Sequence, residues 1–217
     1  MKKIESEEIT MKEITRIEKV YDFDELSDSA KEKARNEYLN YFRCAEDFET
    51  FCIDDLANNH FPDSDLKVEF SLSSCQGDGF NIYGKMKLSE AIDFVMSKTD
   101  KLNENIRFFN WLKTLDYEIE LSQNKARYTY CYVDYSIFAI DIECMLGYDG
   151  YTSNNKNHFS MLCKFDKEFK QYIKELCKEY EKDGYKYFYE VDDEEIKEMW
   201  ESNGYLGFYE DGSHCYS

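Results

Sequence analysis

The stretch LKVEFSL at residues 66–72 decides the fold class of this chain. Every second residue in it is apolar, which is the two-residue period of a β-strand with one buried face. The loop QGDG follows at 76–79, and apolar residues return at 80–83. Two strands joined by a glycine-containing loop predict a β-hairpin, whose apolar face the rest of the chain has to cover.

Helical patterns surround this hairpin in the sequence. Apolar residues recur every three or four positions, and they predict helices at 27–42, 46–58, 89–96, 106–112, 166–182 and 193–200. Ser27 or Ser29 is expected to cap the first helix, and Asp192 or Asp193 the last. Gly184 is expected to end the helix that begins at 166, because glycine is common just beyond a helix C-terminus.

Further strands are expected at 14–23, 117–121 and 128–142, with a short strand or hairpin in the tail at 205–216. No linker rich in Pro, Gly or Ser interrupts the chain, and the regular strand–helix alternation of a barrel or doubly wound sheet is absent. The sequence therefore predicts a single α+β domain at 13–217, with antiparallel sheet hairpins packed against several helices. Residues 1–12 are expected to form a flexible N-terminus.

The charge balance is strongly acidic. The 217 residues include 46 acidic and 27 basic side chains, a formal net charge of −19, together with 16 Phe, 19 Tyr and 2 Trp. So many aromatic residues exclude a disordered chain. The negative field would repel nucleic acid and acidic membranes and attract basic surfaces. We therefore expect no direct nucleic-acid or membrane binding, although acidic side chains also serve solubility alone.

The cysteines point to a reducing compartment. There are eight, no CxxC occurs, and the chain starts MKKIE without the apolar run of a signal peptide. No segment approaches the roughly 20 apolar residues of a membrane helix. The sequence thus predicts reduced thiols and a location in the cytoplasm of a host cell.

Catalytic chemistry has little support. The three histidines, His60, His158 and His214, lack zinc spacing, so no metal, cofactor or catalytic residue is expected. The leading interpretation of the QGDG loop is a turn.

One alternative is a carboxylate metal site of the kind found in nucleases, built from Asp78, Asp134, Asp141 or Glu143. Residues 129–148 hold no basic side chain to bind phosphate, which favours a solvated sheet face over such a site.

Two acidic clusters are more informative. The first contains no basic residue and consists of Glu46, Asp47, Glu49, Asp54 and Asp55. Phe51, in the same helix, is expected to face the core. The second contains a single lysine among nine acids: Glu190, Asp192, Asp193, Glu194, Glu195, Glu198, Glu201, Glu210 and Asp211. Acids this little balanced by lysine favour a binding surface for a basic partner over a merely solvated face.

Three short motifs resemble an uncharacterised group of proteins from phages and prophages: FDELS at 23–27 followed by AKEKA at 30–34, QGDGF at 76–80, and FYEDG at 208–212. The resemblance implies a genetic context, that of small accessory proteins of mobile elements, some of which counter host defence. It transfers no fold, activity or catalytic residue.

Charge and context together lead to a hypothesis. The chain is expected to be a phage or mobile-element inhibitor, similar in action to an anti-CRISPR protein. It would bind the basic nucleic-acid-binding surface of a host nuclease effector, such as a Cas protein, and block it sterically through the two acidic clusters. The alternatives are a metal-dependent nuclease or nucleotide-processing enzyme that disarms a defence signal, and a structural or regulatory partner without mimicry.

Overall fold

The computed structural model describes residues 17–74, 78–121, 156–204 and 206–215. Contacts divide the chain into two compact units: Unit 1 combines Met1–Tyr38 with Val191–Ser217, and Unit 2 is Leu39–Glu190. The sequence predicted one domain because it contains no linker. The chain crosses from Unit 1 to Unit 2 within the helix Asp28–Phe42, and it crosses back just after the helix Lys156–Tyr189. Neither crossing is a linker rich in Pro, Gly or Ser. Each unit is described by itself below.

The sheet of Unit 2 is built on the predicted hairpin. Strand β1 (Asp65–Ser71) pairs antiparallel with β2 (Gly79–Lys87), and β2 pairs antiparallel with β3 (Glu118–Leu121). Val68 lies opposite Ile82, and Met86 lies opposite Ile119. All four are buried, so the alternation in residues 66–72 predicted both the hairpin and its apolar face.

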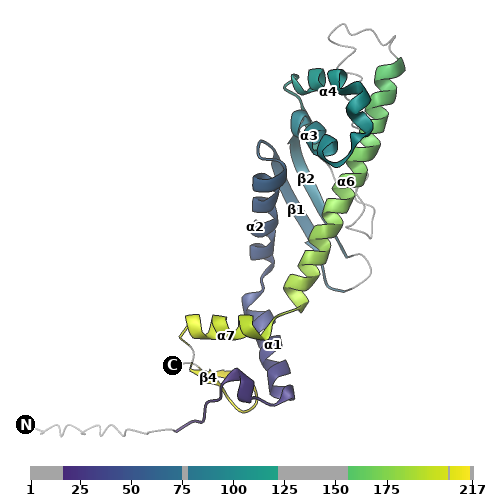
Figure 1. Ribbon diagram of the computed structural model, residues 1–217. Helices are drawn as coiled ribbons and strands as arrows, with labels where there is room; N and C mark the ends of the chain where they lie inside the picture. Colours follow the sequence, from purple (N-terminus) through teal and green to yellow (C-terminus); the bar gives the residue numbers. More distant parts are fainter. Residues whose placement is uncertain (1–16, 75–77, 122–155, 205, 216–217) are drawn as a thin grey trace, which may run out of the picture. The chain divides into compact units, whose positions relative to one another are not determined.

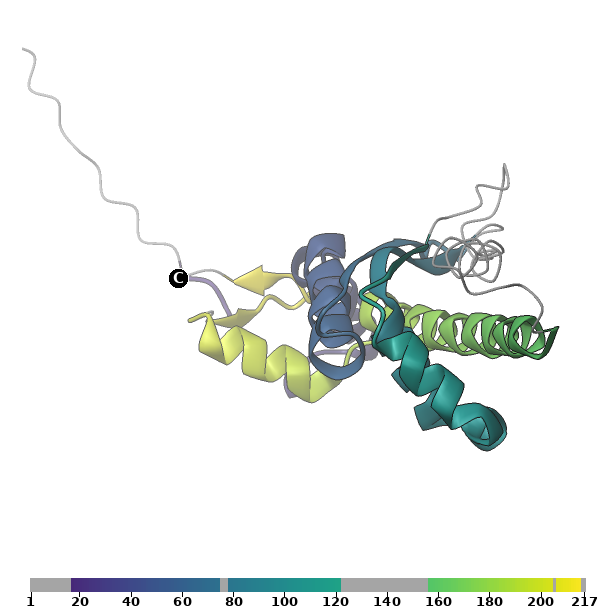
Figure 2. The same cartoon turned by 90° about the horizontal axis from the view of Figure 1, so that it is seen from above.

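The helices of Unit 2 cover that face. They are α2 (Ala45–Asp55), which continues as a π-helical turn (Leu56–His60), then α3 (Leu88–Lys98), a 3₁₀ helix η3 (Asp100–Asn105), α4 (Ile106–Lys113) and α6 (Lys156–Tyr189). Helix α2 lies along β1 and α6 along β2 (Figure 1). Seen from above, α3 and α4 group beside α6 (Figure 2). This arrangement confirms the predicted α+β class.

Aromatic rings fill the core of Unit 2. The Phe48 ring of α2 lies 5.3 Å from Phe70 of β1, 6.4 Å from Phe80 of β2 and 5.3 Å from Tyr187 of α6, measured between ring centroids. Phe80 in turn lies 5.1 Å from Tyr180. Rings at these distances contribute about 0.5–1.5 kcal/mol per pair beyond the apolar area that they bury.

Two local expectations in Unit 2 were wrong. Helix α6 continues through Gly184 to Tyr189 instead of ending there. A Cβ atom at Gly184 would lie 2.3 Å from Leu72 Cδ1 and 2.9 Å from the Phe48 ring, so this glycine lets the helix approach the core. Phe51 was expected to be buried but is 58% exposed, because Phe48 and Cys52 hold the buried face of α2.

Unit 1 joins both ends of the described chain. It contains η1 (Phe23–Glu25), the first part of α1 (Asp28–Phe42), α7 (Asp193–Ser202) and the short antiparallel pair β4 (Gly207–Phe208) and β5 (His214–Cys215). The predicted tail hairpin is therefore confirmed. The predicted first strand is wrong in its described part, where only Tyr21 forms an isolated bridge, to Phe208.

The helix caps of Unit 1 follow the sequence signals. Ser27 Oγ accepts a hydrogen bond from the Ala30 amide at 3.3 Å, and Asp192 Oδ1 accepts one from the Glu194 amide at 3.1 Å. Beneath the helices, the Phe208 ring lies 5.5 Å from Phe23 and 5.6 Å from Trp200. Unit 1 thus has a small aromatic core of its own.

The close approach at Gly184 generates a stability prediction. Gly184→Ala should lower the free energy of unfolding by about 1–2 kcal/mol, because overpacking against Leu72 and Phe48 outweighs the roughly 1 kcal/mol of helix propensity that alanine gains. Urea denaturation followed by circular dichroism measures this. The control is Lys182→Ala, at an exposed position of the same helix, which should change little. A Gly184→Ala protein more stable than wild type would contradict the packing argument.

Candidate functional site

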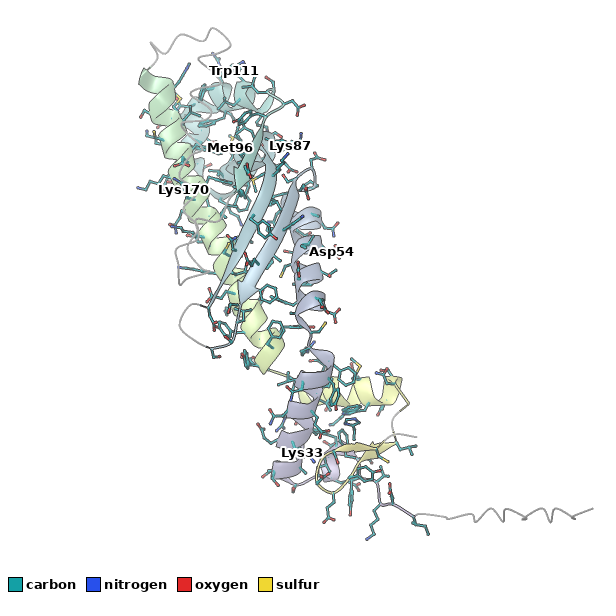
Figure 3. The ribbon with its side chains drawn as sticks, turned by 180° about the vertical axis from the view of Figure 1, so that it is seen from behind. Lys33, Asp54, Lys87, Met96, Trp111 and Lys170 are labelled. Carbon is teal, nitrogen blue, oxygen red and sulfur yellow. The ribbon has the colours of Figure 1, made fainter. Side chains whose placement is uncertain are left out.

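The first acidic cluster lies on α2 in Unit 2. Glu46, Asp47, Glu49 and Asp54 are exposed, and Figure 3 shows Asp54 on the side of α2 away from the sheet. Asp55 differs from them. It accepts hydrogen bonds from the Tyr180 hydroxyl at 2.5 Å and from Asn59 Nδ2 at 2.6 Å.

The environment of Asp55 makes it a structural residue. Burial raises its pKa, but the hydrogen bonds from Tyr180 and Asn59, with His60 nearby, outweigh burial and hold the pKa below its ordinary value. Burial, together with the hydrogen bond to Asp55, raises the pKa of Tyr180. Asp55 therefore joins α2 to α6, and only the other four acids of the first cluster remain as candidates for partner binding.

The second acidic cluster does not form one surface. Glu190 is the last residue of Unit 2, and the other eight acids belong to Unit 1. Within Unit 1, three carboxylates contact α1. Arg35 Nε and Nη2 donate to the two oxygens of Asp193 at 2.8 and 2.9 Å. Tyr38 donates to Glu195 at 2.8 Å, and Lys33 donates to Asp211 at 2.6 Å. These acids link α7 and the tail to α1.

Ionisation in Unit 1 reflects these contacts. The hydrogen bond with Asp193 raises the pKa of Arg35, and the hydrogen bond from Lys33 holds the pKa of Asp211 well below its ordinary value. Lys197 contacts both Glu194, at 2.8 Å, and Asp24, at 2.9 Å, which raises its pKa. The one lysine of the second cluster thus also connects elements of the unit.

An acidic stripe remains on the outward side of α7. Glu194, Glu198 and Glu201 are exposed and spaced four and three residues apart, so they share one face of the helix with about 5–6 Å between neighbouring Cβ atoms. We call these residues the α7 stripe. Asp192 and Glu210 are also exposed, but Asp192 is the N-cap of α7.

His214 has surroundings that sequence reasoning missed. Its ring stacks on Trp200 with centroids 5.0 Å apart, and its Nδ1 lies 2.9 Å from Glu37 Oε2. Its side chain is only 8% exposed. Because Glu37 is 177 positions away in the chain, no local pattern signals this contact. It fastens β5 to α1 and α7.

The carboxylate of the QGDG loop is held by hydroxyl groups. Asp78 accepts hydrogen bonds from Ser71 at 3.1 Å, Ser73 at 3.2 Å and Tyr185 at 2.8 Å. The last contact raises the pKa of Tyr185 to about 12. Asp78 therefore connects the β1–β2 loop to the C-terminal end of α6.

Only part of the alternative metal site falls within the residues that the structure describes. Among the residues that the structure describes, no three His, Cys, Asp or Glu side chains gather where they could hold a metal ion. Asp134, Asp141 and Glu143 lie outside the described residues, so a site completed by them stays a prediction.

The described cysteines carry free thiols. Cys52, Cys177 and Cys215 are buried, Cys44 is half-buried and Cys163 is exposed. Burial raises the pKa of both Cys52 and Cys177 to about 12. These thiols pack as small apolar side chains. The remaining three cysteines of the chain lie outside the described residues.

Comparison with protein-family models, with curated proteins and with solved structures finds no match to this chain. The resemblance to the phage and prophage group therefore stays a prediction. Within the described ranges, no helix is both long and apolar enough to cross a membrane.

The acids that hold Unit 1 together should be separable from those that do not. Asp193→Asn should lower the free energy of unfolding by about 1 kcal/mol, since it breaks the two-pronged contact with Arg35 while water screens the partly exposed pair. Glu198→Gln, on the same helix, should leave stability within about 0.5 kcal/mol of wild type. Urea denaturation of both variants measures the difference. Equal stability of the two would contradict the assignment.

Thiol reactivity should follow burial. Of the five described cysteines, iodoacetamide near neutral pH should modify Cys163 first in the native protein, while Cys52 and Cys177 stay unmodified because each is buried and its raised pKa suppresses the thiolate. Peptide mass spectrometry after timed labelling gives the order, and labelling in urea shows that each thiol can react. Early modification of Cys52 would contradict the buried environment.

Proposed function

We propose that this chain is an acidic inhibitor that binds a basic protein surface through the α7 stripe. In the fuller form of the proposal, it comes from a phage or mobile element and acts in the host cytoplasm. There it covers the nucleic-acid-binding surface of a nuclease effector, as an anti-CRISPR protein would. The effect is steric and needs no turnover.

The observation that carries the proposal is the difference between the acids of α7 that contact α1 and those that face solvent. Asp193 and Glu195 contact α1, whereas Glu194, Glu198 and Glu201 face solvent. A surface evolved only for solubility mixes both signs of charge. The lysine of this helix, Lys197, pairs with Asp24 and with Glu194 of the stripe itself, so Glu198 and Glu201 carry the unbalanced charge. The outward side of α7 is therefore left negative.

Such a stripe suits a groove lined by Lys and Arg. A basic groove that binds nucleic acid recognises a row of negative charges, mainly phosphates. Carboxylates that repeat at each helical turn offer a similar row. The net charge of −19 adds long-range steering, which speeds the encounter and weakens as salt rises.

The first acidic cluster provides a second candidate contact. Two of its exposed carboxylates, Asp47 and Asp54, lie four residues before and three residues after Phe51, so they share a helix face with this ring, which is 58% exposed. An aromatic ring with acids beside it suits an arginine side chain, which stacks on the ring and pairs with a carboxylate. We include this face of α2 in the proposed binding surface of Unit 2.

The proposal predicts the effect of charge reversal. Replacing Glu194, Glu198 and Glu201 together by Lys should slow association with the target at least tenfold at low salt and flatten its salt dependence, because the steering charge is removed. The experiment screens a panel of purified CRISPR effector nucleases for binding by biolayer interferometry. It then asks whether the chain displaces labelled nucleic acid from each effector that it binds.

A matched control carries the same change of charge elsewhere. Asp65, Glu120 and Glu179 are exposed acids of Unit 2 outside both clusters, and replacing all three by Lys should affect association far less. If both triple variants bind and inhibit like wild type, the α7 stripe is not the binding surface. Binding without displacement of nucleic acid would contradict the inhibitory mechanism.

A further inference from the structure

A hollow lies beside α4 in Unit 2, apart from both acidic clusters. Its volume is about 570 Å³, within the range of small-molecule sites. The described residues that line it include Glu104, Ile106, Arg107, Phe108, Trp111 and His158. Figure 3 labels Trp111 on α4, near the N-terminal end of α6. We call this the α4 hollow.

The walls of the hollow are flat aromatic rings. The Phe108 ring stacks on His158 with centroids 4.4 Å apart and planes 18° from parallel. Trp111 lies 6.0 Å from Phe108 at an interplanar angle of 33°. Beside them, Ile106 is 45% exposed. Phe108 itself is buried, so the half-buried Trp111 and the exposed Ile106 supply the apolar surface that a planar ligand would cover.

The elements around the hollow are held firmly. Phe109 and Leu112, on the other side of α4, are fully buried, and the Phe109 ring lies 5.8 Å from Phe165 of α6. Lys101 of η3 pairs with Glu168 of α6 at 2.7 Å. A site on fixed elements needs little reorganisation to bind a ligand.

Two opposite charges stand at the hollow. Arg107 and Glu104 are exposed, and no ion pair within the described residues engages either side chain. A guanidinium group suits the oxygens of a phosphate, whereas a carboxylate suits an amino group. Helix α6 begins here with no acid in its first turn, so its positive end adds to Arg107 in favouring an anion.

From this arrangement we infer that the α4 hollow binds a mononucleotide. The base packs against the aromatic wall at Trp111, an exocyclic amino group donates to Glu104, and the phosphate pairs with Arg107. The net charge of the chain opposes an anion at long range. That repulsion is screened beyond about 8 Å at physiological salt, so the nearby charges decide binding. The inference does not depend on the proposed function of the α7 stripe.

The test uses adenosine 5′-monophosphate, with adenosine and inorganic phosphate as comparison ligands. The chain has two tryptophans, Trp111 and Trp200, so a base stacked at the hollow should quench part of the intrinsic fluorescence. We expect the nucleotide to bind more tightly than adenosine by about tenfold, as expected for one charge-assisted contact. Titration calorimetry should give the same order, with no binding of phosphate alone.

Single substitutions test which side chain contacts each part of the ligand. Arg107→Gln should weaken nucleotide binding to the level of adenosine, and Trp111→Ala should weaken both ligands roughly tenfold or more, the scale of base stacking. Trp111→Phe should keep binding by calorimetry and lose the quenching. The control is Lys164→Gln, an exposed cation elsewhere on α6, which should bind like wild type. Circular dichroism verifies that each variant is folded.

Three results would overturn the inference. One is the absence of both heat and quenching at millimolar nucleotide. Another is quenching that persists in Trp111→Phe, which would place the ligand elsewhere. The third is an Arg107→Gln variant that still prefers the nucleotide over adenosine, which would remove the phosphate from this site.

Discussion

The Phe48 ring is the contact on which Unit 2 depends. It meets Phe70 and Phe80 on neighbouring strands and Tyr187 and Phe188 on α6, with Phe188 5.5 Å away. One side chain of α2 therefore sets the distance between sheet and helix. Gly184 permits this approach, since any Cβ there would enter the space of Phe48 and Leu72. With α6 held so close, the Tyr185 hydroxyl reaches Asp78 at 2.8 Å and orders the end of the hairpin loop.

In Unit 1 the equivalent constraint is the pairing of charges. Its aromatic core is small, its acids outnumber its bases, and three of its described cations each join two elements. Arg35 connects α1 to α7, Lys33 connects α1 to the tail, and Lys197 connects α7 to η1. Acids that join two elements stabilise the unit, whereas Glu194 of the α7 stripe pairs with Lys197 of its own helix and links no second element by that contact. The proposed binding surface of Unit 1 therefore consists of carboxylates that do not join one element to another.

Local rules explain which parts of the fold the sequence predicted. The hairpin at 66–83 and the cap at Asp192 depend on neighbours within a few residues, and both were confirmed. Gly184 shows where such rules fail, because a glycine that ends one helix permits close packing in another. The contact of Arg35 with Asp193 spans 158 positions, and His214 meets Glu37 over a still longer separation. Periodicity within one segment carries no information about which distant partner a side chain meets.

Part of the candidate site follows from helical phase, that is, from the position of each acid around the axis of α7 relative to the buried residues. Ile196 and Trp200 are the buried residues of α7, and Asp193 precedes them by three and seven positions, so it belongs to the buried side. Glu194, Glu198 and Glu201 fall on the opposite side. A count of acids treats these residues alike, whereas phase separates Asp193, which meets Arg35 of α1, from the three acids of the α7 stripe. An acidic segment is better evidence for a basic partner when its acids lie out of phase with the core.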